Sequence, residues 1–302
     1  MTAAAIAMDI NAAALRRDER REKLALFSLC APASLLVLVI IVAPVGWLFW
    51  LSLFNDAGVM SLDNYTRMFE SKSYTRIFIT TFQVSFLTTA LCVLLGYPLA
   101  YFLAQLPRRW AALGMLAVLL PFWTSLLVRT YAWLVVLQRK GLVNQWGMEL
   151  GLWEAPLRLA HNMNGTLIGM AHIMLPFLVL PLYGAMKAID FDYMKAAANL
   201  GANPVSAFRH VFLPLSLPGL FAGIIIVFVL CLGFFVTPAV LGGGKVIMVS
   251  MKIETLVDLF FNFGTASALG VVLLALTLLV LFAAHKLLQL DRVLGGGHGG
   301  HP

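Results

Sequence analysis

The chain has 302 residues, of which 61% are hydrophobic and 12% are charged, and its mean hydropathy is +0.90. This composition excludes an ordinary soluble domain and predicts a polytopic membrane protein. The net charge of +7 does not indicate nucleic-acid binding, because the basic residues flank apolar runs instead of forming a patch.

Long apolar runs divide the chain into membrane-spanning segments. Each run exceeds the roughly 20 residues that a helix needs to cross the hydrocarbon layer. We therefore expect an all-α membrane protein whose six transmembrane helices form one bundle between an N-terminal tail, residues 1–23, and a C-terminal tail, residues 287–302. The predicted helices cover residues 24–54, 77–106, 110–137, 165–186, 218–240 and 265–286.

The N-terminal tail combines an Ala-rich start with a charged cluster from Arg16 to Lys23. A signal peptide needs a shorter apolar core followed by a small-residue cleavage site, so we expect the first run to stay attached as an anchor. The tail is expected to be solvated and partly disordered, with an amphipathic surface helix as the alternative. The Gly-rich end from Gly295 to Pro302 is also expected to be disordered, and its two histidines are a weak metal signal.

Basic residues set the predicted orientation. The most basic short segments, residues 16–23 and the turn Pro107-Arg108-Arg109, are expected on the cytoplasmic side of the membrane. Both termini are then cytoplasmic, and so is the polar segment 190–217 between the fourth and fifth predicted helices.

The third predicted helix carries a cluster of aromatic residues around one arginine. A rise of about 1.5 Å per residue from Trp110 puts Arg129 about 28 Å along a straight helix, near the outer edge of the hydrocarbon. There an arginine can snorkel and aromatic residues suit an interfacial belt, which is the favoured interpretation. The alternative is that the cluster lines the outer mouth of a substrate path, formed by Trp123, Arg129, Tyr131 and Trp133.

Two further features lie near the outer ends of the later helices. Gly242-Gly243-Gly244-Lys245 lacks the spacing of a phosphate-binding loop and is expected to be a flexible turn. Glu254 and Asp258 lie four residues apart on one face of a short helix. They could attract a cationic substrate to the entrance, although a solvated face is favoured.

Histidine and cysteine give little indication of a metal site or a disulfide. Cys30, Cys92 and Cys231 all lie in apolar runs without metal or disulfide spacing. His172 in the fourth helix is either functional or satisfied by a neighbouring helix, and both alternatives stay open. We predict no metal site.

The sequence of the polar segment 190–217 predicts a helix, a turn and a second helix. Asp190 or Asp192 can cap a first helix that ends at Gly201, in the left-handed conformation. Asn203 can cap the second helix with Pro204 as its first residue. Pro214 and Pro218 are expected to end that second helix before the next apolar run.

The spacing within this segment resembles the "EAA" loop of ABC importer permeases. Ala196-Ala197, then Gly201, then Val211-Phe212-Leu213-Pro214 match that pattern, although Lys195 stands where the family usually has glutamate. The resemblance implies a cytoplasmic coupling helix that docks in a groove on an ATPase subunit. An Ala-rich loop with no partner is the alternative. The implied ATPase contacts are Lys195, Ala196, Ala197, Gly201, Ala202, Pro204, Phe208, Leu213 and Pro214.

Residues 77–286 are similar to the transmembrane core of type I, binding-protein-dependent ABC importers. The run Gly96-Tyr97-Pro98-Leu99-Ala100-Tyr101 looks like the start of that core. Pro121-Phe122-Trp123-Thr124 followed by Arg129 and Tyr131 looks like the polyamine (spermidine/putrescine) branch. The resemblance implies a MetI-like permease fold in the bacterial inner membrane. The implied substrate is a polyamine or, alternatively, another small organic solute such as an amino-acid derivative or opine.

The resemblance also implies partners. These are a second homologous permease, two ATPase subunits that bind ATP and Mg, a periplasmic substrate-binding protein and membrane lipid. No cofactor is expected in this chain itself. No Walker A, His-Glu-x-x-His or Gly-x-Ser-x-Gly motif occurs, so we do not expect an enzyme.

Two rival functions remain at this point. A secondary transporter usually needs an intramembrane carboxylate to couple protons or sodium, and none of the charge-free apolar runs contains Asp or Glu. A channel or an assembly scaffold has no need of the full spacing from Ala196 to Pro214.

Overall fold

The computed structural model of the chain describes residues 3–55, 58–190 and 192–295. The described part is built from helices, as the composition predicts, and its fold is all-α. The helices are α1 (Ala3–Ser52), α2 (Asp63–Glu70), α3 (Lys72–Gln105), α4 (Arg108–Leu119), η1 (Leu120–Trp123), α5 (Leu126–Leu137), α6 (Leu142–Glu149), α7 (Met163–Lys187), α8 (Asp192–Asn199), α9 (Pro204–Ala207), η2 (Phe208–Phe212), α10 (Leu213–Leu232), α11 (Val236–Leu241), α12 (Val249–Asp258) and α13 (Phe263–Gly295).

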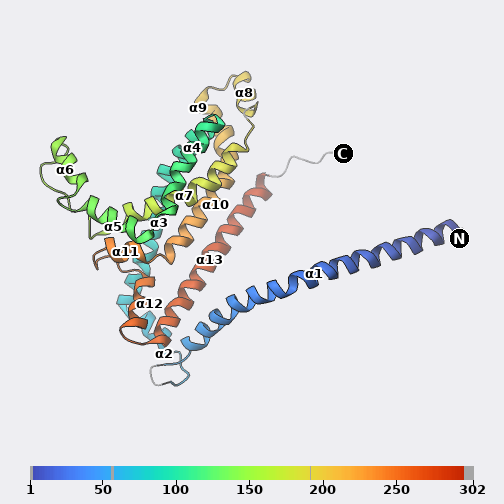
Figure 1. The fold of residues 1–302 in the computed structure, drawn as a ribbon, viewed down its shortest axis with the longest axis horizontal. Helices are drawn as coiled ribbons and strands as arrows, with labels where there is room; N and C mark the ends of the chain where they lie inside the picture. The colour runs from blue at the N-terminus through green and yellow to red at the C-terminus, as the bar shows by residue number, and fades with distance from the viewer. Residues whose placement is uncertain (1–2, 56–57, 191, 296–302) are drawn as a thin grey trace.

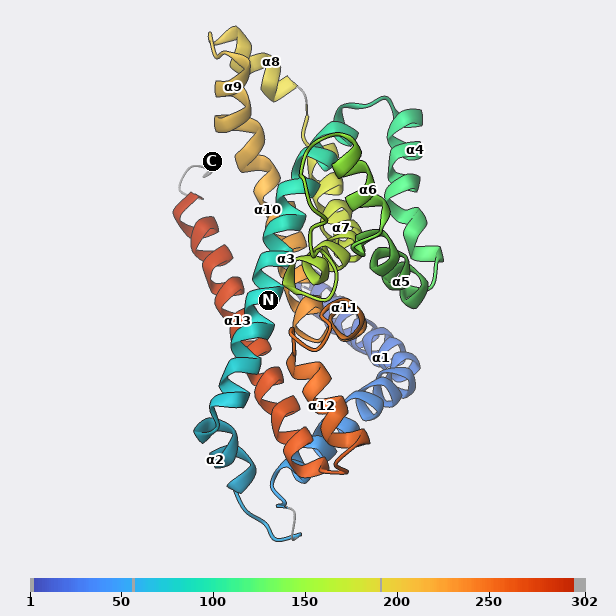
Figure 2. The same ribbon diagram turned by 90° about the vertical axis from the view of Figure 1, so that its left-hand side faces the viewer.

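The helices α3, α7 and α10 run beside one another and form the centre of the bundle (Figures 1 and 2). In the described part, five helices are long and apolar enough to cross a membrane, and the bent pair α4–η1 and α5–α6 could supply a sixth crossing. Helix α13 packs against α10, α12 and α1. Several long apolar helices of this kind make the chain a multi-pass membrane protein.

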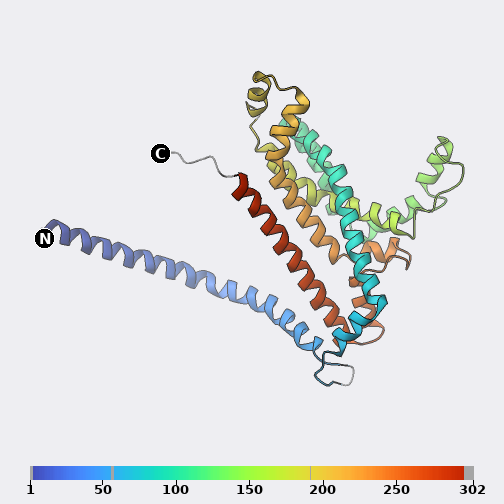
Figure 3. The ribbon, with the colours of Figure 1, turned by 180° about the vertical axis from the view of Figure 1, so that it is seen from behind.

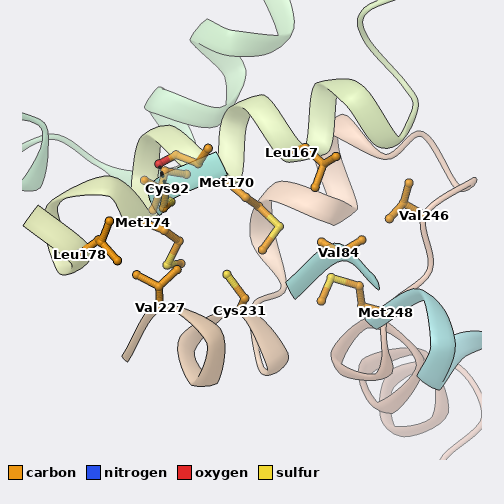
Figure 4. Packing of buried hydrophobic residues seen from close by; sticks show 12 residues of the cluster. Val84, Cys92, Leu167, Met170, Met174, Leu178, Val227, Cys231, Val246 and Met248 are labelled. Carbon is orange, nitrogen blue, oxygen red and sulfur yellow. Dashed lines mark hydrogen bonds between the residues drawn. The ribbon is translucent and has the colours of Figure 1, made fainter. Parts of the chain in front are cut away.

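The core at the centre of the bundle is rich in methionine and small side chains. Met170 and Met174 of α7 lie between Cys92 of α3 and Cys231 of α10, and Leu178 follows Met174 on α7; all are essentially inaccessible to solvent (Figure 4). Cys92 Sγ lies 3.6 Å from the carbonyl oxygen of Ala171, and no disulfide forms among the three cysteines. Both buried cysteines therefore act as small apolar side chains, as the sequence predicts.

Small residues allow α10 to approach α7 closely. A Cβ atom on Gly223 would lie 3.0 Å from the carbonyl oxygen of Leu178, and one on Gly219 would lie 3.0 Å from that of Pro181. Helix pairs in membranes gain their stability from such close packing, because lipid offers no hydrophobic driving force for association. A larger side chain at Gly219 or Gly223 would push the two helices apart.

The third predicted helix is not straight. The segments Arg108–Trp123 and Leu126–Glu149 meet at an angle of 99°. Pro121 lies in a single 3₁₀ turn, and Thr124 and Ser125 are extended, which separates α5 from α4. The expectation of one continuous helix over 110–137 is therefore wrong, and so is the depth of Arg129 that was counted along it.

The fifth predicted helix begins earlier than expected. Residues Pro204–Leu232 form one continuous, largely apolar helical segment, which we call the rod. Within it, η2 is a π-helical turn between α9 and α10. The amide of Leu213 donates to the carbonyl of Phe208, five residues back. Pro214 and Pro218 thus lie inside the rod instead of ending a helix, since π turns and neighbouring helices let membrane helices tolerate proline.

The N-terminal tail and the first predicted span form a single helix, α1. The structure therefore differs from the expected disordered tail from Ala3 onward. Helix α1 meets α13 near its C-terminal end and diverges from the bundle along its length (Figures 1 and 3). The other end of the chain differs too, because α13 continues to Gly295 where a tail was expected from residue 287. Residues 296–302 of the predicted disordered end lie outside the described residues.

A buried polar contact attaches α1 to the bundle. The side-chain amide of Asn64 donates to the carbonyl oxygens of Ser52 and Phe54, at 3.0 and 2.7 Å. Thr265 of α13 donates its hydroxyl to Asn64 Oδ1 at 3.1 Å. Since Asn64 is buried, these hydrogen bonds join α1, α2 and α13 in a fixed geometry.

Candidate coupling loop and translocation path

The polar segment 190–217 begins as local chemistry predicts. Asp190 Oδ1 accepts a hydrogen bond from the amide of Asp192, the first residue of α8. The helix stops at Gly201, whose φ of +84° is strained for any residue with a Cβ atom. The amide of Gly201 bonds back to Ala198, which closes the end of α8. The predicted helix and its glycine end are both confirmed.

Asn203 and Pro204 start the next helix as predicted. The side-chain oxygen of Asn203 accepts a hydrogen bond from the amide of Ser206 at 2.7 Å, and Pro204 occupies the first helical turn. Such a cap satisfies an amide that would otherwise have no partner at the helix start. The turn between α8 and α9 is therefore held at both ends by its own side chains and backbone.

The turn exposes two large apolar side chains. Leu200 is 89% exposed and Val205 is 74% exposed, although both are large aliphatic side chains at the tip of the loop. Ala196 is exposed beside them, while Ala197 and Ala202 are half-buried. Exposed aliphatic groups at the end of the rod suit contact with another protein.

Lys195 interacts within the loop itself. Its Nζ lies 2.7 Å from Asp192 Oδ1, and both side chains are largely exposed. The hydrogen bond from Lys195 to Asp192 raises the pKa of this lysine above its usual range. The lysine is therefore charged in the pair at neutral pH, and it loses that charge as the pH rises through the raised pKa. At the surface such a pair adds little stability.

The predicted loop residues divide into two groups. Phe208, Leu213 and Pro214 lie in the rod, away from the exposed tip. The ring of Phe208 packs edge-to-face on Tyr101 and Tyr97 of α3, with centroids 5.3 and 6.3 Å apart. An open groove of about 400 Å³ lies beside these rings and extends to Pro204 and Val205. The aromatic cluster thus connects the loop to the centre of the bundle.

Tyr97 was not expected to contact the loop. Its hydroxyl lies 2.9 Å from Ser216 Oγ of α10, and Ser216 in turn donates to the carbonyl of Leu213. The Gly-Tyr-Pro-x-Ala-Tyr motif contained the signal, because Tyr97 and Tyr101 are four residues apart and share one helix face. Its partners, Phe208 of η2 and Ser216 of α10, could not be found from local spacing.

The residues predicted for a substrate path come from two parts of the chain. Trp123 and Tyr131 are exposed, at 75% and 55%, whereas Arg129 and Trp133 are half-buried on α5. Glu254 and Asp258 are exposed on α12, which packs against α13 and α3. The acidic pair is thus separate from the aromatic cluster around Arg129.

His172, for which the sequence leaves two roles open, lies next to the aromatic cluster around Arg129. The rings of His172 on α7 and Trp133 on α5 are 5.5 Å apart between centroids. Among the described residues, the Nδ1 atom of His172 and the Nε atom of Arg129 are buried without a hydrogen-bond partner. No group of His, Cys, Asp or Glu in the described part has the arrangement of a metal site.

A known family matches the membrane core. Residues 93–291 match the family described as binding-protein-dependent transport system inner membrane component, which covers more than half of the chain. The chain belongs to this family. It is thus a transport subunit of the membrane and not an enzyme, and it works with other subunits of a binding-protein-dependent system.

Curated relatives share most of their length with this permease. It is 36% identical to the spermidine/putrescine transport system permease protein PotB of Haemophilus influenzae over 233 residues, 76% of this chain and 81% of the relative. It is 33% identical to PotB of Escherichia coli over 234 residues, covering 76% and 85% of the two chains. The expected permease class is therefore confirmed.

A solved structure supports the fold. A chain of the bacterial alginate ABC transporter in complex with alginate pentasaccharide-bound periplasmic protein superimposes with a TM-score of 0.69. The match covers 92% of this permease and 97% of that chain at 17% identity. At that identity the likeness concerns the fold alone, which is that of ABC importer permeases.

Proposed function

We propose that the chain is the permease subunit of an ATP-driven importer that carries polyamines such as spermidine and putrescine across the bacterial inner membrane. The identity of 36% and 33% to two relatives named for spermidine/putrescine transport is the observation that carries this proposal. The run Pro121-Phe122-Trp123-Thr124 with Arg129 and Tyr131 agrees with it.

The proposed complex contains a second homologous permease, two ATPase subunits and a periplasmic binding protein. ATP and Mg are bound by the ATPase subunits, and this chain holds no cofactor. Its N- and C-termini lie in the cytoplasm together with α8 and α9. The end of α13 points toward the same end of the bundle as α8 and α9, which is consistent with this orientation (Figure 1).

The loop of α8 and α9 couples ATP hydrolysis to movement of the bundle. The exposed tip around Ala196, Leu200 and Gly201 docks in a groove of an ATPase subunit. Closure of the ATPases moves the rod Pro204–Leu232, and the Phe208–Tyr101 contact transfers that movement to α3. The loop must contact the ATPase differently in the two states, since only differential contact shifts a conformational equilibrium.

Glycine substitutions in the reconstituted complex test this proposal. Gly201→Asp strains the loop where φ is +84°, and Gly58→Asp is a matched control at φ +73° in a loop near α2 with nothing close to a Cβ atom. We expect Gly201→Asp to abolish labelled-spermidine uptake and binding-protein-stimulated ATP hydrolysis while the complex still assembles. The control should keep at least about half of both activities, since a strained position costs only about 1–3 kcal/mol.

The outcomes separate the parts of the proposal. If the intact complex hydrolyses ATP in response to another small organic solute and ignores spermidine and putrescine, the polyamine assignment is wrong and the importer stands. If Gly201→Asp transports like the control, the assigned role of the loop is wrong.

A further inference from the structure

A basic pocket lies where α5, α7 and the loop after α11 meet. Its volume is about 260 Å³ and it contains no acidic side chain. Its four basic or titratable lining residues are Arg139, Arg158, His161 and Lys245. Among the described residues, Arg139, Arg158 and Lys245 form no ion pair. Positive charges that converge without a counter-charge repel one another, so the pocket suits an anionic group from outside the chain.

The buried side chain of Asn144 holds two of the charged segments together. Asn144, which is fully buried, donates to the carbonyls of Gln138 and Leu157 at 3.0 Å each, and its Oδ1 accepts from the amide of Leu157 at 2.8 Å. These bonds fix the residues that precede Arg139 and Arg158. The loop is therefore ordered by buried hydrogen bonds beside its charged side chains.

Asn162 attaches the third segment. Its side-chain amide donates to the carbonyl of Arg158, and its backbone amide donates to the carbonyl of Leu241 at 3.1 Å. The amide of Lys245 then donates to the carbonyl of Gly242 at 3.1 Å. Lys245 is thus positioned beside Arg158 through a short chain of hydrogen bonds.

The backbone of the pocket is strained at one residue. His161 has a φ of +58°, which is unusual for a residue with a side chain. Gly243 packs directly on it, and a Cβ atom at Gly243 would overlap the Cβ atom of His161 at 2.5 Å. Such strain persists only where the surroundings enforce it and is frequent at functional sites.

The pocket lies on the membrane face opposite the coupling loop. It adjoins the start of α7, whose 25 residues extend for about 37 Å before α8 begins. With α8 in the cytoplasm, the pocket faces the periplasm. Its apolar lining is limited to Leu159 and Ala160, which leaves little surface for the acyl chains of a lipid. A polyamine is itself a cation and would be repelled there.

We propose that this basic pocket docks carboxylate side chains of the periplasmic binding protein. The inference rests on the proposed function, which supplies a soluble periplasmic partner. It also rests on the charges of Arg139, Arg158 and Lys245, which have no ion-pair partner in the described part of the chain. Salt bridges in the pocket orient the binding protein on the permease, and charge complementarity speeds their association.

Charge reversal tests the docking site in the complete complex in nanodiscs, with its purified binding protein as the probe. Arg139→Glu and Arg158→Glu should each weaken binding on the order of tenfold. Lys140→Glu is the matched control, because Lys140 is exposed next to Arg139 but does not line the pocket. Its effect should stay within about threefold, as expected for a charge outside the contact.

Carbodiimide cross-linking tests the chemistry of the contact. This reagent joins a primary amine to a carboxylate, so Lys245 should form an amide with an acidic residue of the binding protein. Lys245→Arg keeps the charge and lacks the primary amine, so it should lose that cross-link. Reversing the cross-linked acid to lysine should restore binding to Lys245→Glu.

The possible results are distinct. Equal binding by the Arg139, Arg158 and Lys140 variants overturns the docking site, as does an affinity that follows the anionic lipid content of the nanodisc. Loss of binding-protein affinity in the Arg139 variant, with spermidine-driven uptake still present in the unmodified complex, supports it. Absence of uptake in the unmodified complex contradicts the proposed function and leaves the binding measurement as the separate test of the pocket.

Discussion

Single residues determine the shape of the turn between α8 and α9. Gly201 supplies the left-handed conformation, and Asn203 accepts a hydrogen bond from the amide of Ser206. Each acts on neighbours within three residues, so their roles can be predicted from sequence. The pocket formed by Arg139, Arg158 and Lys245 could not, because its members come from three segments joined only by tertiary hydrogen bonds.

The cap of α9 leads to a prediction at this scale. Asn203→Ala should cost about 1 kcal/mol of local stability and raise hydrogen exchange at the amide of Ser206 about fivefold. Asn199→Ala is the control, since Asn199 is exposed at the end of α8. Mass-spectrometric hydrogen exchange on the purified permease measures both variants. Equal exchange in the two would show that the cap adds nothing to the loop.

At the level of whole helices, proline has two different outcomes in this chain. Pro121 stands next to a 99° break, whereas Pro214 and Pro218 lie inside one continuous rod. After Pro121 the extended residues Thr124 and Ser125 complete the break, and the Thr124 hydroxyl donates to the carbonyl of Pro121 at 2.7 Å. In the rod, a π turn restores the hydrogen bonding before Pro214. The sequence shows where prolines occur. It does not show how neighbouring groups compensate for the backbone hydrogen bonds that the prolines remove.

The aromatic contact between α3 and the rod leads to a second prediction. Tyr101 packs edge-to-face on both Phe208 and Phe212, with centroids 5.3 and 5.0 Å apart. Tyr101→Ala should lower uptake about tenfold while ATP hydrolysis continues, because movement of the rod no longer reaches α3. Phe102→Ala is the control on the neighbouring, exposed position. Uptake and ATP hydrolysis that fall together, or a similar loss in the control, would contradict this role.

On the scale of the molecule, the charge-free runs predict the number of apolar segments but not how each crosses the membrane. The α4–α5 pair bends where one straight crossing was expected, and α5 leaves the direction of α4. The acids Glu254 and Asp258 lie on α12, whereas Arg129 lies on α5. A path through the bundle depends on how distant segments pack against one another. The apolar runs and the basic residues between them do not specify that packing.

The proposed orientation can be tested by cysteine labelling. In a background without Cys30, Cys92 and Cys231, and with the permease produced without its ATPase subunits, Leu200→Cys should react with a membrane-impermeant maleimide only after the cells are permeabilised. Gly58→Cys and Gly244→Cys, which have open space around their Cβ positions, should react in intact cells. Labelling of Leu200→Cys from outside would reverse the assigned orientation and move the basic pocket to the cytoplasm.

The attachment of α1 has a consequence for the order of synthesis. Asn64 receives its hydrogen bond from Thr265, which follows 201 residues later in the chain. At a synthesis rate of about 5–20 residues per second, Thr265 emerges about 10–40 s after Asn64. During that interval the apolar part of α1 must remain in the bilayer without α13. Its high hydropathy over Ser28–Ser52 lets lipid alone hold it there until the last helix arrives.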